Sequence, residues 1–334
     1  MHGELFSLLG TPLPSYFVLM LVGFVFATTM GALCVKRWGQ NPDVIVDLGL
    51  AMVLAGIIGA RLLHVVADGH FTDYVNLCVA PAKVDWPISK EECTSGLPQA
   101  SCAFDAAPDG AVGVWDDAKG VCHPSGPDCL AWAKFWSGGL TFYGGFIAAT
   151  WGAWWLFKRD RFPFWKGCDM GGMMVPIGLG FGRLGCFLAG CCFGKPTQLP
   201  WGIAFPGFSP ASEAQVSAGL LAQKHLPSLP VHPTQLYEAV SAFAISAIGV
   251  LFVQGRKRYD GAVFAAFLAM YGVIRFLLEF LRDDERGGFW GLSTSQWIGL
   301  CMLAAALTIH RQRSKTGLIE PMKPNSAGPS AAAA

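Results

Sequence analysis

A short stretch between residues 182 and 194 combines side chains that can do chemistry. It reads GRLGCFLAGCCFG and holds one guanidinium group, Arg183, and three thiols, Cys186, Cys191 and Cys192. A guanidinium group binds phosphate or carboxylate through a planar fork of N–H donors. Thiols bind metals, form disulfides, act as nucleophiles or simply fill a core. The stretch therefore predicts an anion site beside cysteines that have several possible roles.

The spacing of the three cysteines favours these roles unequally. They do not form two spaced pairs, and no spaced histidine completes a tetrahedral set, so metal binding is the least favoured role. A disulfide from one of the adjacent pair to Cys186, or to the odd cysteine of residues 67–137, stays open. A thiolate nucleophile activated beside Arg183 also stays open. Small thiols that pack a tight turn are the most favoured role, and we expect neither a metal nor a cofactor.

A second group of ionisable residues lies within a later apolar segment. The sequence RFLLEFLR places Arg275, Glu279 and Arg282 at positions i, i+4 and i+7, on one face of a helix. A charge in hydrocarbon costs roughly 2.5–3.5 kcal/mol on insertion scales, so it normally faces a cavity or a partner. Arg61 and Glu238 also lie in apolar segments. Interhelical ion pairs or snorkelling are one explanation. An excess of buried arginines instead predicts an anionic ligand such as a lipid headgroup.

Membrane-spanning helices must position these residues. The chain has 334 residues, of which 53% are hydrophobic and only 14% are charged, whereas soluble domains are about 25% charged. Apolar runs long enough to cross a hydrocarbon core of ~30 Å recur along the sequence. We predict an all-α polytopic membrane protein with about seven transmembrane helices, of which the fourth is the weakest because it contains Pro176 and many glycines. The predicted spans are residues 15–35, 44–66, 139–157, 169–191, 232–254, 262–281 and 292–310.

Basic residues between the spans predict the orientation, because they favour the cytoplasmic face. Four basic clusters follow the first, third, fifth and last spans, which places all four on one face of a seven-helix protein. The amino terminus is therefore expected outside and the carboxyl terminus in the cytoplasm. No basic residues precede the first span and no A-x-A-like site follows it, so it is expected to be a retained helix. Because topology explains the basic residues, nothing indicates a nucleic-acid partner.

The predicted transmembrane domain, residues 1–315, is interrupted by a long extracytoplasmic insertion, residues 67–137. Cysteines in an oxidising compartment pair, so we expect two disulfides with one cysteine left over and an undetermined pairing. A loosely folded loop with some free thiols is the alternative. Residues 316–334 are of low complexity and are predicted to be a disordered cytoplasmic tail. The cysteines of the insertion are Cys78, Cys93, Cys102, Cys122 and Cys129.

Motifs along the chain resemble, in order, those of the bacterial prolipoprotein diacylglyceryl transferase family. The resemblance covers nearly all of the membrane-spanning part and none of residues 67–137. It implies a seven-helix enzyme of the bacterial inner membrane with an external amino terminus. The motifs are SYFVLMLVGF (15–24), GARLLHVV (59–66), GGLTFYGG (138–145), GRLGCFLAGCCFG (182–194), WGIAFP (201–206), HPTQLYE (232–238), RFLLEFLR (275–282) and STSQW (293–297).

The resemblance also implies a reaction and its partners. The diacylglyceryl group of phosphatidylglycerol passes to the lipobox cysteine thiol of a preprolipoprotein signal peptide, and glycerol phosphate leaves. This chemistry needs a cationic clamp on the phosphate, a base for the thiol and a water-poor cavity open to lipid. The predicted catalytic residues are Arg183, Arg275, Tyr143 and Glu279. The predicted substrate-binding residues are Tyr16, Arg61, Cys186, Cys191, Gly194, Glu238 and Arg282.

The chain departs from the family signature, G-R-x-G-N-F-x-N-x-E-x-x-G, at its polar positions. Cys186, Ala189 and Cys191 replace the two asparagines and the glutamate, and Tyr143 replaces a histidine of the third helix. One explanation is a divergent transferase in which other groups supply the polarity. The other is a paralogue that binds anionic phospholipid but is non-catalytic or uses another acceptor. A transporter is less favoured, because the sequence has neither a continuous polar pathway nor related halves.

Overall fold

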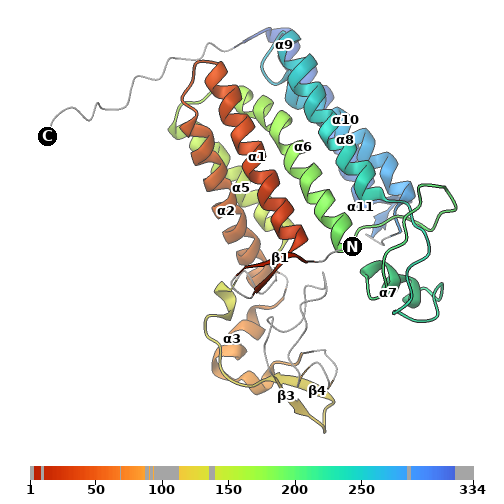
Figure 1. Ribbon diagram of the computed structural model, residues 1–334. Helices are drawn as coiled ribbons and strands as arrows, with labels where there is room; N and C mark the ends of the chain where they lie inside the picture. Colours follow the sequence, from red (N-terminus) through yellow and green to blue (C-terminus); the bar gives the residue numbers. More distant parts are fainter. Residues whose placement is uncertain are drawn as a thin grey trace. The chain divides into compact units, whose positions relative to one another are not determined.

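The computed structural model describes residues 4–8, 11–67, 69–86, 90, 93, 113–134, 140–283 and 287–319. The described chain is mostly helical and includes three two-stranded antiparallel hairpins, which an all-α prediction does not include (Figure 1). It divides into two compact units. The first unit joins Met1–Val46 to Arg159–Ala334, and the second unit is Asp47–Lys158.

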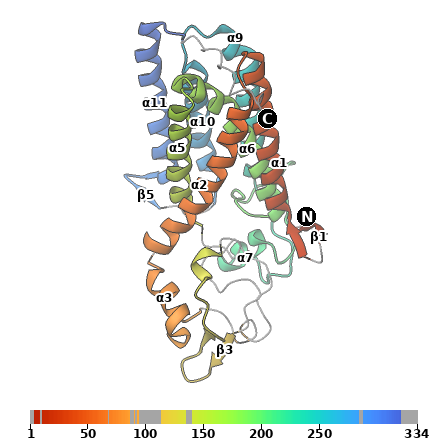
Figure 2. The same cartoon turned by 90° about the vertical axis from the view of Figure 1, so that its left-hand side faces the viewer.

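In the first unit, one glycine-rich helix lies at the centre of the packing. This helix, α6, packs against α1, α8 and α10, and α10 in turn packs against α11 (Figures 1 and 2). Short π-helical and helical turns, Gly249–Val253 and α9 (Gln254–Arg256), extend α8. The bounds of the main helices are α1 Ser15–Arg37, α6 Phe164–Ala189, α8 Thr234–Ile248, α10 Ala262–Leu278 and α11 Thr294–Thr316.

The central helix α6 is longer and more regular than its sequence suggests. It begins five residues before the predicted span and continues through Pro176 without ending. Its glycines explain why neighbouring helices approach closely. A Cβ atom built on Gly172 would lie 2.9 Å from the Cα of Phe264 in α10, and one on Gly185 would lie 3.0 Å from the Cα of Tyr16 in α1. The first contact holds α6 against α10, and the second holds the cysteine-bearing end of α6 directly against α1.

Asp169, near the start of α6, holds the beginning of α10. Its side chain is fully buried and accepts backbone N–H hydrogen bonds from Gly261, Val263 and Phe264 at 3.0, 2.9 and 3.1 Å. Lys257 neutralises the carboxylate, with its Nζ atom 2.8 Å away. Because the first N–H groups of a helix lack intrahelical partners, this carboxylate caps α10 and fixes it to α6.

Shorter elements connect the helices of the first unit. The segment between α6 and α8 carries α7 (Pro210–Ser217) and a small core made of Phe205, Ala211 and Val231. Two hairpins lie next to helix ends, one before α1 and one before α11. Their strands are β1 Glu4–Leu8, β2 Thr11–Pro14, β5 Gly288–Phe289 and β6 Leu292–Ser293.

The second unit combines two long helices with a small disulfide-linked part. Helix α2 (Asp43–Ala67) begins in the first unit and continues into the second, where it packs on α5 (Phe142–Arg159). The two helices approach so closely that a Cβ atom on Gly59 would lie 2.5 Å from the carbonyl oxygen of Gly144. The described part of this unit also contains α3 Phe71–Val79, β3 Gly113–Asp116, β4 Val121–Pro124 and two 3-10 turns, Pro81–Lys83 and Ala131–Ala133.

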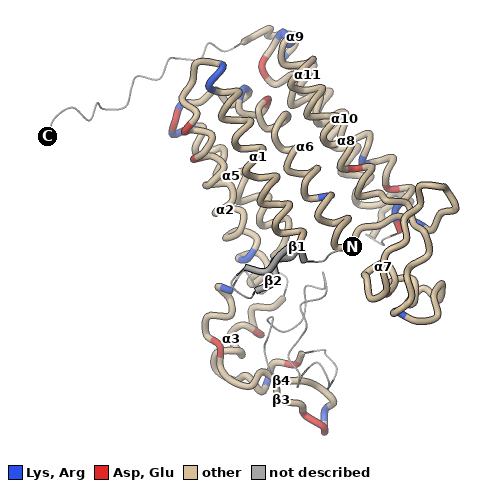
Figure 3. Tube along the Cα trace, in the orientation of Figure 1, with Lys and Arg blue, Asp and Glu red and all other residues tan. Residues whose placement is uncertain are grey.

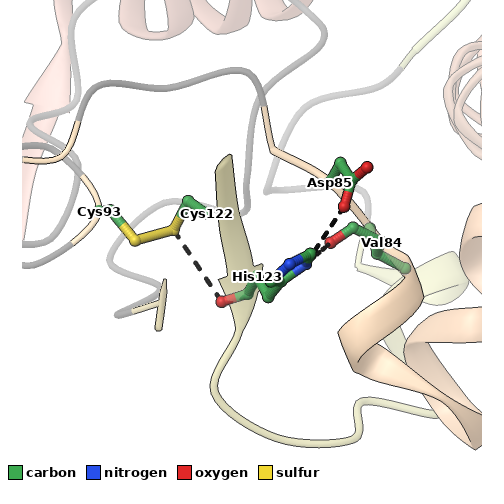
Figure 4. The surroundings of a disulfide bond; sticks show 5 residues. All are labelled: Val84, Asp85, Cys93, Cys122 and His123. Atoms are coloured by element: carbon green, nitrogen blue, oxygen red, sulfur yellow. Dashed lines mark hydrogen bonds and ion pairs between the residues drawn. A yellow bond between two sulfur atoms is a disulfide. The ribbon is translucent and has the colours of Figure 1, made fainter. Parts of the chain in front are cut away.

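Two disulfides link the predicted insertion, which confirms that part of the prediction. They join Cys78 to Cys129 and Cys93 to Cys122; Cys102 lies outside the described residues. The second disulfide lies in a small core beside Trp86 and next to His123 (Figure 4). The Nδ1 atom of His123 lies 2.8 Å from the carbonyl oxygen of Val84 and 3.2 Å from a carboxylate oxygen of Asp85.

Replacing both cysteines of either disulfide by serine is expected to loosen the second unit. The bridges span 51 and 29 residues, and loops of this length restrict the unfolded chain by about 3.5 to 4 kcal/mol. Limited proteolysis of the purified protein should therefore cleave residues 67–137 much faster in each double variant. The control is the Cys34→Ser/Cys301→Ser variant, because both of these residues are free thiols. Equal cleavage rates for all variants would contradict the stabilising role.

Five helices in the described part of the chain are long and apolar enough to cross a membrane. The last turn of α1 carries two basic residues (Figure 3). Helices α5 and α11 coincide with the other two predicted spans but are not among the five. The chain is thus a mostly helical, multi-pass membrane protein, whereas seven spans and their orientation stay predictions. The five candidate spans are Ser15–Arg37, Asp43–Ala67, Phe164–Ala189, Thr234–Arg256 and Ala262–Leu281.

Candidate active site

A buried carboxylate joins three helices of the first unit. Glu238 on α8 has a side chain that is only 1% exposed, and its Oε2 atom lies 3.0 Å from Nε of Arg183 on α6. The hydroxyl of Tyr271 on α10 donates a hydrogen bond to Oε1 of Glu238 at 2.9 Å. Nη1 of Arg282 lies 4.0 Å from the same Oε2 atom. Glu238 therefore fixes the guanidinium group of Arg183 in place, a role that no carboxylate within the 182–194 stretch can fill.

A second ion pair lies one helical turn after Tyr271 on α10. Nη1 of Arg275 lies 2.7 Å from Oε2 of Glu279, as the i, i+4 spacing predicts. Nη2 of Arg275 donates a hydrogen bond to Oγ of Ser295 at 2.7 Å, which ties the pair to α11. Both side chains of this pair are less than a tenth exposed.

Arg282 does not continue the stripe formed by Arg275 and Glu279. The α-helix ends at Leu278, a 3-10 turn covers Glu279–Leu281, and Arg282 has an extended backbone. The prediction that one helical face carries all three side chains is therefore wrong for Arg282. Its guanidinium group turns toward Glu238 instead, because the tighter turn and the strand-like residue rotate it away from the helical register.

We call this group of three arginines and two glutamates the arginine cluster. Its members are Arg183, Arg275, Arg282, Glu238 and Glu279. It contains three guanidinium groups and two carboxylates, so it carries one excess positive charge. Among the three arginines, Arg183 has the most accessible side chain, at 17% exposed, compared with 7% for Arg275 and 1% for Arg282. An anion that enters the cluster would therefore meet Arg183 first.

The cysteine turn follows directly from the end of α6. Gly190 ends the helix in a left-handed conformation, with a φ angle of 73°, and Cys192 also has a positive φ of 60°. This backbone folds the chain back, so that the sulfur atoms of Cys186, Cys191 and Cys192 all lie within 4.8 Å of one another. Cys186 and Cys192 carry free thiols, so neither is bridged to Cys191.

The surroundings of Cys192 favour its thiolate form. Hydrogen bonds from the Cys186 and Cys191 thiols, together with the Arg183 and Arg282 guanidinium groups, hold the pKa of Cys192 well below its usual range, although burial opposes this. Arg183 and Arg282, which both belong to the arginine cluster, contribute to this shift. The cysteine turn and the arginine cluster are therefore one electrostatic unit.

Gly194 and Tyr16 have packing roles in this region. A Cβ atom on Gly194 would lie 2.5 Å from the carbonyl oxygen of Leu281 and 2.8 Å from side-chain atoms of His232 and Thr234, so only glycine fits. The backbone of Gly194 also forms an antiparallel β-bridge with that of Arg282, whose side chain lies beside Glu238. Tyr16 packs against Gly185 of α6. Both residues shape the region, and direct contact of either with a substrate stays a prediction.

Two predicted site residues, Arg61 and Tyr143, belong to the second unit. Arg61 donates hydrogen bonds to the carbonyl oxygens of Trp132 and Ala131 at 2.7 and 2.6 Å, and its guanidinium carbon lies 5.0 Å from the Tyr74 ring centre. These contacts connect α2 to the segment that directly follows Cys129. Tyr143 lies near the start of α5 and is 55% exposed. Their proposed roles toward a substrate stay predictions.

Two residues of the arginine cluster's surroundings are missing from the sequence-based prediction. Tyr271 contacts Glu238, and Ser295 contacts Arg275. The spacing of Tyr271, four residues before Arg275 on the same helix, is a signal that the sequence contains. Ser295 belongs to the STSQW motif, and the sequence does not indicate which hydroxyl of this motif contacts Arg275.

Comparisons with known proteins place this arrangement in a family. A family model described as prolipoprotein diacylglyceryl transferase matches residues 4–84 and 123–311 and leaves the centre of the predicted insertion unmatched. Three curated relatives, all named phosphatidylglycerol–prolipoprotein diacylglyceryl transferase, are similar in sequence to this chain. The relative from Clostridium tetani is 28% identical over 300 residues, which cover 90% of this chain and 93% of the relative.

The other two relatives match over shorter regions. The one from Pseudomonas fluorescens is 40% identical over 156 residues, covering 46% of this chain and 51% of the relative. The one from Stenotrophomonas maltophilia is 31% identical over 203 residues, covering 57% of this chain and 67% of the relative. Because the family model covers well over half of the chain, the chain belongs to the prolipoprotein diacylglyceryl transferase family.

Proposed function

We propose that this protein transfers the diacylglyceryl group of phosphatidylglycerol to the lipobox cysteine of preprolipoproteins. The observation that carries the proposal is the arginine cluster, which lies within the part of the chain that matches the family. Transfer breaks the bond between a glycerol carbon and a phosphate oxygen, so negative charge grows on the departing glycerol phosphate. Fixed guanidinium groups in a water-poor site stabilise that charge without having to reorganise.

Arg183 is the proposed phosphate ligand, because it is the most accessible arginine of the cluster and is held by Glu238. Arg275, on α10, is proposed to support the same charge, and Glu279 keeps its guanidinium group in position. A phosphate bound at Arg183 would balance the one excess positive charge of the arginine cluster. Arg282, Cys186, Cys191, Gly194 and Tyr16 shape the site around it.

The acceptor thiol must lose its proton as its sulfur attacks the glycerol carbon. The new sulfur–carbon bond forms as the carbon–oxygen bond breaks, and the bonding electrons leave with glycerol phosphate. Both oxygens of Glu238 are already engaged, by Tyr271 and Arg183, so Glu238 is a positioning residue and a poor base. Tyr143 and Glu279 are the proposed acceptors of the proton, and Arg61 is proposed to help bind the lipid or the peptide.

We further propose the setting of this reaction. The basic clusters after the first, third, fifth and seventh predicted spans support seven transmembrane helices in the bacterial inner membrane, with the amino terminus outside. Under this topology residues 67–137 face the oxidising compartment, which agrees with two disulfides there. The proposed partners are phosphatidylglycerol and the signal peptide of a preprolipoprotein. We also propose that residues 1–315 form the transmembrane domain and that residues 316–334 form a cytoplasmic tail.

The altered signature supports a second candidate function. Cys186, Ala189 and Cys191 remove three polar side chains while Arg183 and its ion pair remain. A protein of this kind would bind an anionic phospholipid but pass nothing to a lipobox thiol. The two functions differ in one observable, which is the formation of a thioether.

Cells depleted of their own diacylglyceryl transferase test the proposal. Expression of this protein is expected to restore growth and to convert a tagged preprolipoprotein to its diacylglyceryl form, measured as a mass increase of the peptide. The Arg275→Ala variant should fail, because the charge on the leaving group loses a ligand. Wild-type protein that is inserted normally, binds phosphatidylglycerol and forms no thioether would exclude the transferase and leave the lipid-binding function.

A further inference from the structure

Three sulfur atoms converge at the end of α6. Cys186 comes from the last turn of the helix and is buried, whereas Cys191 and Cys192 come from the turn that follows and are half-buried. All three sulfur atoms lie within 4.8 Å of one another. Three sulfur ligands at about 2.3 Å from one ion lie ~4 Å apart in a trigonal plane, so the observed spacing needs only a small contraction to hold an ion.

The backbone of the turn is fixed from several sides. The N–H of Cys191 donates to the carbonyl oxygen of Cys186 at 3.1 Å. The side chains of Gln235 and Thr234 on α8 donate to the carbonyl oxygens of Cys191 and Cys192 at 2.6 and 2.9 Å. A ligand set held by packing and hydrogen bonds loses little entropy when it binds an ion. The fold therefore fixes the backbone that brings the three cysteines together.

We propose that Cys186, Cys191 and Cys192 form a three-sulfur site for one Cu(I) ion. Soft thiolate ligands select Cu(I) and Zn(II) among biological cations. Structural zinc is almost always four-coordinate, and no fourth histidine, cysteine, aspartate or glutamate joins this group among the described residues. A monovalent ion that is satisfied by three sulfur ligands fits this set better.

The charges around the turn also suit such a site. Three thiolates and one Cu(I) ion carry a net charge of minus two, which would be costly in a region poor in water. Arg183 and Arg282 both interact electrostatically with Cys192, and the one excess positive charge of the arginine cluster offsets one of these two negative charges. The sequence spacing alone disfavours a metal, because C-x₄-C-C contains no second pair. The left-handed residues Gly190 and Cys192 change this by folding the three sulfurs together.

The site shares Cys186 and Cys191 with the proposed substrate site, so its test measures the bound ion directly and does not depend on transfer activity. Full-length protein in detergent is reduced, mixed with Cu(I) in the presence of a chromophoric chelator such as bicinchoninate, desalted and analysed for copper and protein. We expect one tightly held copper per chain, and X-ray absorption that shows only sulfur neighbours. The Cys186→Ser/Cys191→Ser/Cys192→Ser variant should lose it, and the single Cys186→Ser variant should bind at least ~10-fold more weakly.

The matched control removes three other free thiols, in the Cys34→Ser/Cys168→Ser/Cys301→Ser variant. It should keep its copper at the wild-type affinity. Circular dichroism and size-exclusion chromatography show whether each variant is folded. If the triple variant is unfolded, the copper affinity of the single Cys186→Ser variant tests whether the turn cysteines bind the ion. Copper that is held equally by wild type and by variants lacking the turn cysteines would overturn the proposal. So would stoichiometric Zn(II) binding without Cu(I) binding.

Discussion

Replacing Arg183 by alanine is expected to lower the rate of diacylglyceryl transfer by about 10²–10³-fold, the usual effect of removing one preorganised ligand for developing charge. The reason lies in its position, because Arg183 is the most accessible of three clustered arginines and Glu238 holds its Nε atom at 3.0 Å. Arg183→Lys keeps the charge but loses the planar fork, so only part of the rate should return. The measurement uses phosphatidylglycerol vesicles, a lipobox peptide and mass spectrometry of the thioether product.

A matched control separates this effect from a general loss of arginine. Arg311 is an exposed arginine near the end of α11, so Arg311→Ala should retain wild-type transfer. Thermal unfolding of both variants shows whether the rate difference reflects folding. If folded Arg183→Ala protein transfers within threefold of the wild-type rate, then Arg183 is not the phosphate ligand.

Local sequence rules predicted the features of this protein that depend on short spacing. The i, i+4 interval predicted the ion pair between Arg275 and Glu279, and the apolar runs predicted helices at all seven positions where they occur. The count of cysteines predicted two disulfides in the insertion. In each case the physical cause acts within a few residues, or depends only on composition.

Features that depend on tertiary contacts were beyond those rules. Glu238 and Arg183 are 55 residues apart in the sequence, and nothing in either segment specifies that α8 places this carboxylate against α6. Arg282 left the expected stripe because the helix tightens over Glu279–Leu281 before it. The sulfur atoms converge because Cys192, a non-glycine residue, adopts a positive φ angle, which few sequence rules anticipate.

These contacts also explain how the altered signature retains a polar site. Cys191 stands where the resemblance leads us to expect a glutamate, yet Arg183 still has a buried carboxylate partner, which α8 supplies. Tyr271 donates to the other oxygen of that carboxylate. A divergent turn is therefore compatible with an ordered guanidinium group, because the supporting ligand comes from another helix.

Removing the carboxylate of Glu238 is expected to destabilise the protein by about 3–5 kcal/mol, the usual cost of breaking a buried ion pair from one side. Its side chain is 1% exposed, and without it both Arg183 and Arg282 lose a buried counter-ion. Glu238→Gln keeps the shape and an acceptor for Tyr271, so its effect isolates the charge. The measurement is the apparent unfolding temperature in detergent, together with transfer activity at a temperature where wild type and Glu238→Gln are both folded.

The control is Glu213→Gln, because Glu213 on α7 is exposed and an exposed carboxylate contributes little to stability. A second comparison uses Tyr271→Phe, which removes the hydrogen bond to Glu238 but leaves the ion pair. The Glu238→Gln and Tyr271→Phe effects should not add in the double variant, since both act on one carboxylate. If Glu238→Gln unfolds at the wild-type temperature and transfers at the wild-type rate, this carboxylate does not position Arg183, and the phosphate site must be organised by the turn itself.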